Sequence, residues 1–516
     1  MEMDRRKFLS TAVIAGGAAA LAGLAGCSPS AEPATASADS NGSEGTEAKN
    51  QEKTADIVIV GSGAAGLSAA CTASEKGASV VLLEAMPMTG GASLGATATN
   101  IGGSQKQKDA GVEDNAELIL ESYAKDLDDP YVLATAKMYS ENNGATYDWL
   151  MSDMGVKFSD EVQFFPPYPV ARICYPIGGG PGIAKTLTEK IEESPVELLL
   201  ETTATELIKE NGTVVGVIAE AADGTEYRIN AKAVVLAAGG FGARRDMLPY
   251  ESLKNVIFYG SESSDGKAMG LALYGGAMLR YLDNLSIEGG GLELSPGTGT
   301  QLYSVVLGSF RDAAGIIIGP DGNRIMNEMG PAPAQVNAYR SLPDSTAYLF
   351  LDKASFDVFY ALGTREVGGV FTPDTWEKWL ASEDLPFIVT ADTVDEVASE
   401  AGINSEGLKA TIESFNADAP AGIDSVFNRP IASSIGEGPY YIIKMNLRYA
   451  HSYGGLIANE NLEVLDWSET PIPGLYGTGQ MLCSIQGRDN IAKPSTGTSF
   501  AYTSGRRAVL NALETF

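Results

Sequence analysis

The sequence predicts an α/β fold built on a parallel β-sheet. Residues 56–60, DIVIV, form a short β-branched apolar run that suits a buried parallel strand. Residues 67–76 favour a helix, and residues 79–83, SVVLL, read as a second strand. A strand, a helix and another strand in this order indicate a βαβ unit, whose two strands run parallel. Residues 233–236, AVVL, predict a further buried strand of the same sheet.

A glycine-rich turn joins the first predicted strand to the helix. It contains Gly61, Gly63 and Gly66 in the pattern G-x-G-x-x-G, and an acidic residue, Glu84, ends the next strand at 84 − 66 = 18 positions after the last glycine. Such glycines allow a tight turn and let a pyrophosphate approach the helix N-terminus, while the acidic side chain accepts hydrogen bonds from a ribose. The turn therefore predicts a Rossmann-like dinucleotide-binding domain.

Composition excludes several classes of function. The chain has 516 residues with 36 Lys+Arg and 66 Asp+Glu, a net charge of −30, which excludes binding to nucleic acid through a general basic surface. It has one histidine, His451, and four cysteines, none in a C-x-x-C pair. A multi-histidine metal centre, c-type haem and a cysteine-rich cluster are therefore not expected, and no metal site is predicted. Redox chemistry would need an organic cofactor.

The N-terminus has the features of an export signal. Arg5 and Arg6 precede an apolar run, residues 11–26, which is typical of a twin-arginine signal. The run is shorter than the roughly 20 residues that span a bilayer; an uncleaved membrane anchor is the alternative. The sequence LAGC, ending at Cys27, resembles a lipobox, so Cys27 is the expected lipidation site. We expect a signal over residues 1–27, a disordered linker over 28–53, and a lipid-anchored protein on the extracytoplasmic face of the cell membrane.

Later glycine-rich segments indicate which dinucleotide binds. Residues 88–93, MTGGAS, follow Glu84 closely, residues 233–241 end in a double glycine, and residues 472–480 read IPGLYGTGQ near the C-terminus. A glycine turn at the start of a domain and a closing strand near its end are typical of the FAD-binding half of a large flavoenzyme. NAD is less expected, because a diffusible nicotinamide pool is not expected outside the cytoplasm. The predicted cofactor is non-covalent FAD.

Three motifs carry a resemblance to a known family. Residues 264–269, SDGKAM, are similar to its Gly-Asp-Gly segment, and residues 451–456, HSYGGL, to its His-Thr-Met-Gly-Gly-Leu. Arg311, followed by Gly322, Arg324, Asn327 and Glu328, is similar to its Arg…Gly-x-Arg-Phe-x-Asn-Glu run. Over residues 54–516 the chain resembles the FAD-dependent fumarate reductase and succinate dehydrogenase flavoproteins, particularly soluble exported members such as urocanate reductases, and the related 3-ketosteroid dehydrogenases.

The resemblance implies the domain organisation and the cofactor contacts. It implies a Rossmann-like FAD-binding domain over residues 54–284 and 448–516 with an inserted α+β clamp (capping) domain over residues 285–447, and an active site between them. The predicted FAD contacts are Gly61, Gly63, Ala64, Ala65, Gly66, Glu84, Ala85, Gly90, Gly91, Ala92, Ser93, Ala204, Ala238, Gly239, Asp265, Gly455, Gly479 and Gln480.

The resemblance also implies two catalytic residues. Arg311 would protonate one carbon of an activated double bond while flavin N5 gives hydride to the other. Because free arginine has a pKa of roughly 12.5 to 13.8, a carboxylate must resupply the proton. Glu288, Glu293 and Asp312 are the open candidates. His451 would bind a substrate oxygen and stabilise an enolate-like transition state.

Departures from the family pattern argue against fumarate as the substrate. No second histidine lies in residues 284–294. The family's C-terminal carboxylate-binding arginine is either shifted to Arg488 or replaced by Lys493, and Gln480 stands for a flavin-contacting glutamate. Tyr175 lies in a segment where relatives carry a histidine beside the flavin, so it is a further predicted substrate contact.

The resulting hypothesis is an exported FAD-dependent reductase of an activated C=C bond, in an α,β-unsaturated acid or an enone, acting as a terminal reductase in anaerobic respiration. Its partners would be a small-molecule substrate and a separate electron donor such as a cytochrome or a quinol-linked protein. One alternative is a 3-ketosteroid-type dehydrogenase that uses Tyr175 or Tyr502. The other is a flavin-carrying binding or electron-transfer protein without turnover.

Overall fold

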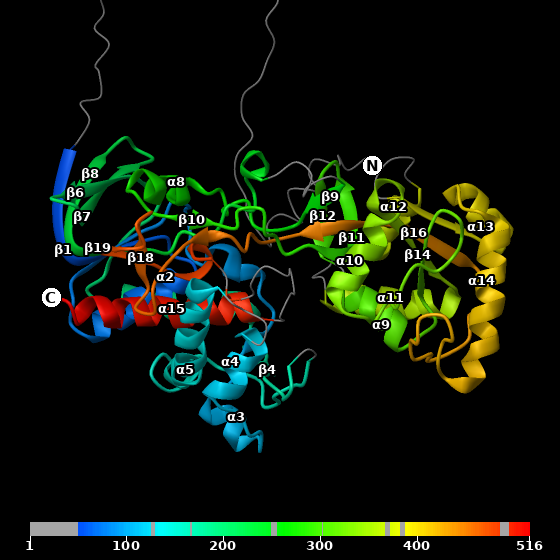
Figure 1. Cartoon of the computed structure of the whole chain (residues 1–516). Coiled ribbons are helices and arrows are strands. Elements are labelled where there is room, and N and C mark those ends of the chain that lie inside the picture. The colour runs from blue at the N-terminus through cyan, green and yellow to red at the C-terminus, as the bar shows by residue number, and fades with distance from the viewer. Residues whose placement is uncertain are drawn as a thin grey trace, which may run out of the picture.

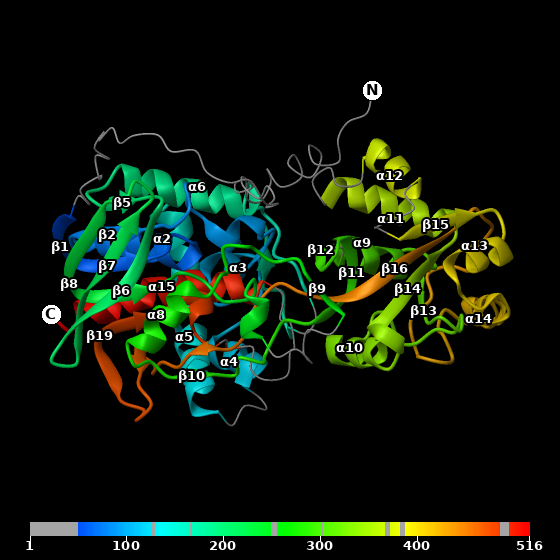
Figure 2. The same cartoon turned by 90° about the horizontal axis from the view of Figure 1, so that it is seen from above.

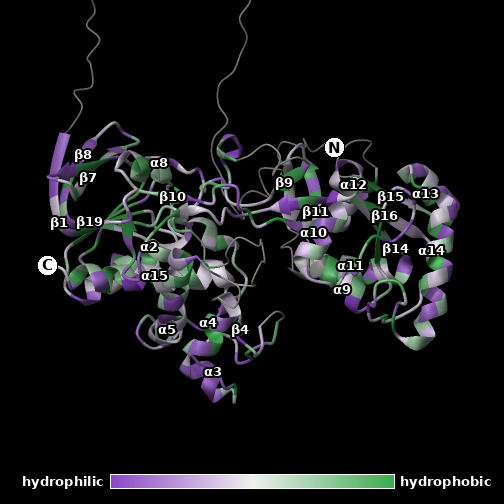
Figure 3. Cartoon of the chain, viewed as in Figure 1, coloured by the Kyte–Doolittle hydropathy of each residue, from purple (hydrophilic) through white to green (hydrophobic). Residues whose placement is uncertain are grey.

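The computed structural model describes residues 50–124, 129–165, 168–248, 255–301, 303–366, 372–381, 387–483, 485 and 495–516. The described chain forms two lobes (Figure 1). The first lobe holds an eight-stranded sheet together with both the N-terminal strand and the C-terminal helix, and the second holds a seven-stranded sheet. Figure 3 shows hydrophobic residues in the strands inside each lobe and hydrophilic residues on outer helices such as α3 (Gln105–Asp109).

The first sheet confirms the predicted parallel α/β fold. Its order is β18-β19-β8-β1-β2-β5. The central strand β1 (Asn50–Val60) runs parallel to both β2 (Val80–Leu83) and β8 (Glu226–Leu236). Ile57, Val58 and Ile59 are fully buried because layers of structure cover both faces of the sheet. Its remaining strands are β5 (Glu197–Leu199), β6 (Thr202–Glu210), β7 (Thr213–Ala221), β18 (Glu463–Leu465) and β19 (Pro471–Gly477). Helix α2 (Ala64–Glu75) packs against β1 and β2, and α6 (Gly179–Glu192) and α15 (Thr496–Leu513) pack against α2.

Strand β1 begins earlier than the sequence predicts. Asn50 to Lys53 pair with Glu226 to Ile229 of β8, so the predicted disordered linker over residues 28–53 is wrong for its last four residues. A backbone ladder needs no apolar side chains, which is why the polar run gave no strand signal. Lys53 also forms an ion pair with Glu197 at 2.6 Å. The expected signal, Cys27 and the rest of the linker lie outside the described residues.

The second sheet has the order β11-β12-β9-β16-β14-β13, with β15 also on β16. Its central strand β16 (Tyr440–Tyr449) is antiparallel to β14 (Thr346–Leu351) and parallel to β9 (Val256–Phe258). Since β9 comes from residues 54–284, the predicted boundary between residues 284 and 285 does not separate the two sheets. The other elements of this lobe are β11 (Glu288–Ser295), β12 (Thr298–Gln301), α9 (Tyr303–Arg311), β13 (Ile316–Ile318), α10 (Ala332–Arg340), η4 (Pro343–Ser345), α11 (Lys353–Glu366), α12 (Pro373–Leu380), β15 (Ile388–Ala391), α13 (Val394–Ala401), α14 (Ser405–Asp418) and η5 (Ala419–Ala421).

Extended segments connect the lobes, and Figure 2 shows β9 and β16 pointing toward the first lobe. Beyond β16 the chain runs antiparallel to the segment before β11: Ser286 N donates to His451 O at 3.0 Å, and Tyr453 N to Asn284 O at 2.8 Å. Tyr259 N donates to Tyr449 O at 3.0 Å. The junction is therefore ordered by backbone hydrogen bonds. The remaining elements are β3 (Thr99–Asn100), β4 (Ile173–Cys174), α4 (Ala116–Ala124), α5 (Pro130–Ser152), α8 (Lys267–Tyr274), β10 (Leu279–Arg280), β17 (Gly455–Leu456), η2 (Gly91–Gly95), η3 (Arg245–Met247) and η6 (Gly479–Met481).

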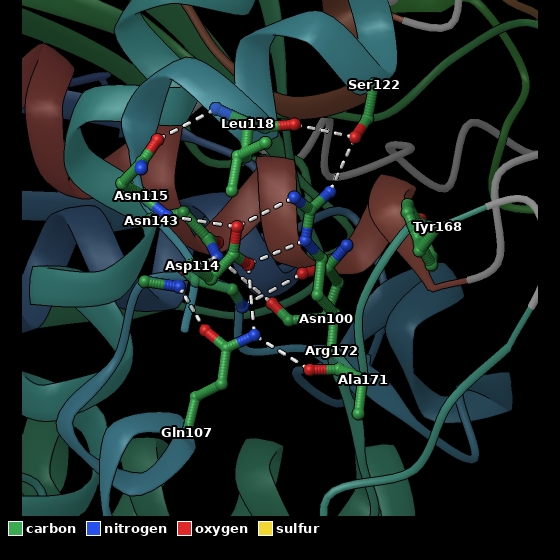
Figure 4. A network of polar contacts seen from close by, with 12 residues as sticks. Asn100, Gln107, Asp114, Asn115, Leu118, Ser122, Asn143, Tyr168, Ala171 and Arg172 are labelled. Atoms are coloured by element: carbon green, nitrogen blue, oxygen red, sulfur yellow. Dashed lines mark hydrogen bonds and ion pairs between the residues drawn. The ribbon is translucent and has the colours of Figure 1, made fainter. Parts of the chain in front are cut away.

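A buried ion pair fixes the helical part of the first lobe (Figure 4). Arg172 donates from Nε and Nη2 to the two carboxylate oxygens of Asp114, at 2.7 and 2.8 Å, and from Nη1 to Ser122 Oγ at 2.8 Å. The two charged side chains are 0% and 1% exposed. Gln107 Nε2 donates to Asp114 Oδ2 and to Ala171 O, which ties α3 to the segment before β4 that carries Arg172. Within the described ranges, no helix is both long enough and apolar enough to cross a membrane.

Replacing Arg172 should destabilise the protein strongly. Arg172→Leu leaves the Asp114 carboxylate buried without its cation, which costs about 3–5 kcal/mol of unfolding free energy. Chemical denaturation followed by circular dichroism measures the loss. The control is Lys185→Ala, because the Lys185–Glu189 pair is exposed and 3.7 Å long, and should change stability by no more than about 0.5 kcal/mol. Equal unfolding midpoints for both variants would contradict the assignment.

Candidate active site

The glycine turn before α2 depends on close backbone contact. Gly61 has a φ of +98°, and a Cβ there would lie 2.7 Å from Ala237 O; a Cβ at Gly66 would lie 1.8 Å from Gly61 O. Gly63 is the N-cap of α2 and makes no side-chain cap hydrogen bond. Its nearest neighbour is Gly90 O, 3.8 Å from where a Cβ would stand. The N-terminus of α2, including Ala64 and Ala65, therefore offers backbone N–H groups to an anion such as a pyrophosphate.

Glu84 lies at the end of β2, where a ribose hydroxyl would need it. Its Oε2 accepts hydrogen bonds from Ser62 N at 2.8 Å and Ser62 Oγ at 2.6 Å, and its Oε1 accepts one from Met86 N at 2.9 Å. Because a carboxylate oxygen accepts about two hydrogen bonds, Oε1 retains one free acceptor position. Thr202 N donates to Glu84 O at 2.8 Å, so β6, which carries Ala204, begins beside this carboxylate.

The segment after Glu84 packs against the glycine turn. Gly90 N donates to Ser62 O at 2.9 Å, and a Cβ at Gly91 would lie 3.5 Å from Gly63 Cα. Ser93 Oγ donates to Gly90 O at 2.6 Å. The structure thus brings residues 90–93, with Ala92 among them, to the turn, and the exposed Ala85 precedes them on the same connection.

Two further connections complete the predicted cofactor site. Gly239 follows β8 through Ala238 with a φ of +82°, and Gly479 follows β19, where a Cβ would lie 3.1 Å from Ala65 Cβ. Gly455 packs against η6, since a Cβ there would lie 2.5 Å from Met481 O. Asp265 forms an ion pair with Lys267 at 2.9 Å and is followed by Gly266, whose N–H donates to Gly240 O.

Gln480 provides a specific test of whether FAD fits. Its Nε2 is buried and has no hydrogen-bond partner among the described residues. A Cβ on Gly240 would lie 3.2 Å from Gln480 Cδ, so this amide lies beside the connection after β8. A buried donor without a partner costs about 1–3 kcal/mol. A flavin carbonyl at this position would satisfy it, and with the glycine turn and Glu84 the residues fit FAD.

His451 lies where the cofactor connections meet the second lobe. Its neighbour Ser452 accepts a hydrogen bond from Phe241 N at 3.2 Å. His451 is solvent-exposed, yet desolvation by the surrounding protein lowers its pKa to about 4. At pH 7 the ring is neutral and can donate one N–H.

Arg311 is the last residue of α9, and its Nε donates to Asp312 Oδ1 at 2.7 Å. This ion pair holds the pKa of Asp312 below its usual range, and the Arg311 side chain is 58% exposed. The other two candidate carboxylates lie elsewhere: Glu293 accepts from Gly297 N in a turn, and Glu288 pairs with Arg448 at 2.8 Å. Arg311 as the acid remains a prediction.

The rest of the Arg311 motif forms a buried ion-pair network inside the second lobe. Arg324 pairs with both Glu328 and Asp424 at 2.7 Å, and Arg429 pairs with Glu328 at 2.8 Å. All four side chains are buried. Arg324 and Glu328 therefore have a structural function, and Asp424 and Arg429 complete the ion-pair network without any motif that could have predicted them.

The predicted substrate contacts are only partly described. Arg488 and Lys493 lie outside the described residues. Tyr175 directly follows β4 and is half-buried, and its backbone N–H donates a hydrogen bond to Ser159 Oγ at 3.4 Å. Tyr502 is fully buried in α15, and desolvation raises its pKa. Desolvation and, to a smaller extent, the charge of Glu288 raise the pKa values of two tyrosines that the sequence did not indicate, Tyr259 and Tyr453.

The fold and the cofactor site define an FAD-dependent oxidoreductase. Residues 56–492 match the family model described as FAD binding domain, and the chain belongs to this family. The predicted family resemblance and the predicted cofactor are thereby confirmed.

Relatives and solved structures match this chain over most of its length. The chain is 29% identical over 500 residues to urocanate reductase from Eggerthella lenta, covering 92% of this chain and 79% of the relative. It is 28% identical over 459 residues to fumarate reductase (cytochrome) from Shewanella frigidimarina, covering 85% and 74%. The structure of 3-ketosteroid delta1-dehydrogenase from Sterolibacterium denitrificans matches with a TM-score of 0.75 over 90% of this chain and 100% of that chain; at 21% identity it shows the fold alone.

A methyl group at Gly66 should weaken FAD binding more than tenfold. In Gly66→Ala the new Cβ would overlap Gly61 O at 1.8 Å, so the turn must open and the helix N-terminus moves away from the pyrophosphate. We expect FAD affinity to fall by more than tenfold, about 1.4 kcal/mol, measured by flavin absorbance of the purified protein. In the control, Gly270→Ala, a Cβ meets nothing within 4 Å, and flavin content should stay at the wild-type level. Full flavin in Gly66→Ala would refute the assigned turn.

Proposed function

We propose that this protein reduces an activated C=C bond in a small molecule, an α,β-unsaturated acid or an enone, with reduced FAD as the direct reductant. The observation that carries the proposal is His451, a neutral hydrogen-bond donor at the junction of the lobes, joined through Ser452 to the connection that bears Gly240 beside Gln480. Relatives named urocanate reductase and fumarate reductase support this reaction class.

Bound and reduced, FAD would supply the hydride equivalent to the β-carbon of the acceptor. The role of His451 is to donate its N–H to the carbonyl or carboxylate oxygen, where negative charge develops as the β-carbon is reduced. A neutral imidazole suits this role, because it donates a hydrogen bond without delivering its proton. We further propose that the second lobe acts as the clamp over the substrate and carries the group that protonates the α-carbon. Arg311 is the donor that the family resemblance implies.

The electrons would come from a separate donor, such as a cytochrome or a quinol-linked protein. The twin arginines at Arg5 and Arg6 and the lipobox ending at Cys27 support a position on the extracytoplasmic face of the membrane, held by a lipid anchor. There the protein would act as a terminal reductase in anaerobic respiration. Its net charge of −30 favours association with a basic donor protein.

Purified FAD-loaded protein should oxidise reduced viologen anaerobically when given one of a panel of unsaturated acids, aryl enoates and enones. His451→Ala should lower kcat/KM by about 10²–10³-fold, the usual effect of losing one oxyanion donor, while flavin content stays unchanged. The matched control is Ser425→Ala on the outer part of the second lobe, which is exposed and should leave turnover unchanged. Oxidation of a 3-ketosteroid with an artificial acceptor, with no enoate or enone reduced, would favour the dehydrogenase alternative; no turnover of either kind would favour a flavin carrier.

A further inference from the structure

A group of ionisable side chains lies at the edge of the second sheet that faces the first lobe. Strands β9 and β16 are neighbours and parallel, with Val256 opposite Leu447 and Phe258 opposite Tyr449. Their carboxyl ends therefore meet at one edge of the sheet. Tyr259 directly follows β9, and His451 follows β16 two residues on. The two side chains thus come from adjacent chain ends.

Tyr259 stands against a buried cation. The guanidinium carbon of Arg448 lies 4.6 Å from the centre of the Tyr259 ring. Arg448 is fully buried; its Nε donates to Gly289 O at 3.0 Å and its Nη2 pairs with Glu288 Oε2 at 2.8 Å. The Glu288 side chain is 21% exposed, so this carboxylate reaches solvent. The Tyr259 phenol therefore packs against the Arg448 guanidinium, and this guanidinium pairs with the Glu288 carboxylate, which reaches solvent.

The phenol shares the environment of His451. Tyr259 is partly accessible to solvent, yet desolvation raises its pKa to about 12, while the nearby Arg448 acts in the opposite direction. At neutral pH the phenol carries its proton, and Arg448 would stabilise the phenolate left behind when that proton is given away. Arg311, in contrast, is 58% exposed and pairs with the adjacent Asp312.

We propose that Tyr259 is the proton donor of the reduction, with Arg448 as its positioning residue; this inference rests on the proposed function. As the hydride equivalent reaches the β-carbon, the π electrons of the C=C bond move to the α-carbon, which takes the proton from Tyr259 Oη. The O–H electron pair stays on the phenolate, which then regains a proton from water that reaches Glu288. The two electrons are those of reduced FAD, resupplied by the external donor.

The experiment compares Tyr259→Phe with wild type on an acceptor that the wild type reduces. Removing a general acid costs about 10²–10⁴-fold in rate, so kcat should fall at least 100-fold while KM and flavin content stay near wild-type values. Tyr259→His, which keeps a transferable proton, should recover part of kcat. The matched control is Tyr453→Phe, a phenol near the same Glu288 that is only 5% exposed, and it should keep wild-type kcat.

Arg448 gives a second test, which decides the matter if Tyr259→Phe fails to fold or loses flavin. Arg448→Lys retains a cation beside the phenol and should keep clearly more kcat than Arg448→Met at equal flavin content. Equal kcat in these two variants would overturn the inference. Unchanged kcat in Tyr259→Phe would also overturn the inference but would leave the proposed function intact. If Arg311→Gln then lost turnover, Arg311 would be the proton donor. If the wild type reduces no acceptor, the proposed function fails and the inference fails with it.

Discussion

The parallel pairing of β9 with β16 is the constraint on which the proposed site depends. The pairing joins residues 256–258 to residues 447–449, although the chain between them forms most of the second lobe. It brings Tyr259 and His451 to one edge and places Arg448 over the phenol. The hydrogen bonds between residues 284–286 and 451–453 extend this order to the first lobe. Geometry at the junction is thus set by backbone hydrogen bonds, which a single surface substitution does not change.

Electrostatics at the junction follow from burial. A guanidinium with no exposed surface is stable only with a carboxylate and backbone acceptors around it, and Glu288 and Gly289 O provide them for Arg448. Desolvation lowers the pKa of His451, which leaves the imidazole neutral at pH 7, and raises the pKa of Tyr259, whose phenol is protonated at that pH. A neutral hydrogen-bond donor and a protonated phenol are the forms that the proposed stabilisation of the substrate oxygen and the proposed proton transfer require.

The sequence predicted the glycine turn and the strand end of the candidate cofactor site because their determinants are local. Gly61, Gly66 and Glu84 lie in one βαβ unit, where a tight turn and a strand end impose residue types at fixed spacings. The sequence could not predict that Asn50 to Lys53 join the sheet, since strands pair through backbone hydrogen bonds, which do not require apolar side chains. Nor could it predict the tyrosines at the junction: Tyr175 and Tyr502 stood in recognisable segments, whereas Tyr259 is near Glu288 and Arg448 only through long-range strand pairing.

The most direct test is a crystal structure of the FAD-loaded protein with a saturated analogue of an acceptor that it reduces. The account predicts the analogue's carbonyl or carboxylate oxygen within hydrogen-bond distance of the His451 ring, and its α-carbon about 3–3.5 Å from Tyr259 Oη, a near-attack separation. An analogue bound with Arg311 at the α-carbon and Tyr259 turned away would contradict the assigned donor. An analogue bound away from His451 would contradict the site itself.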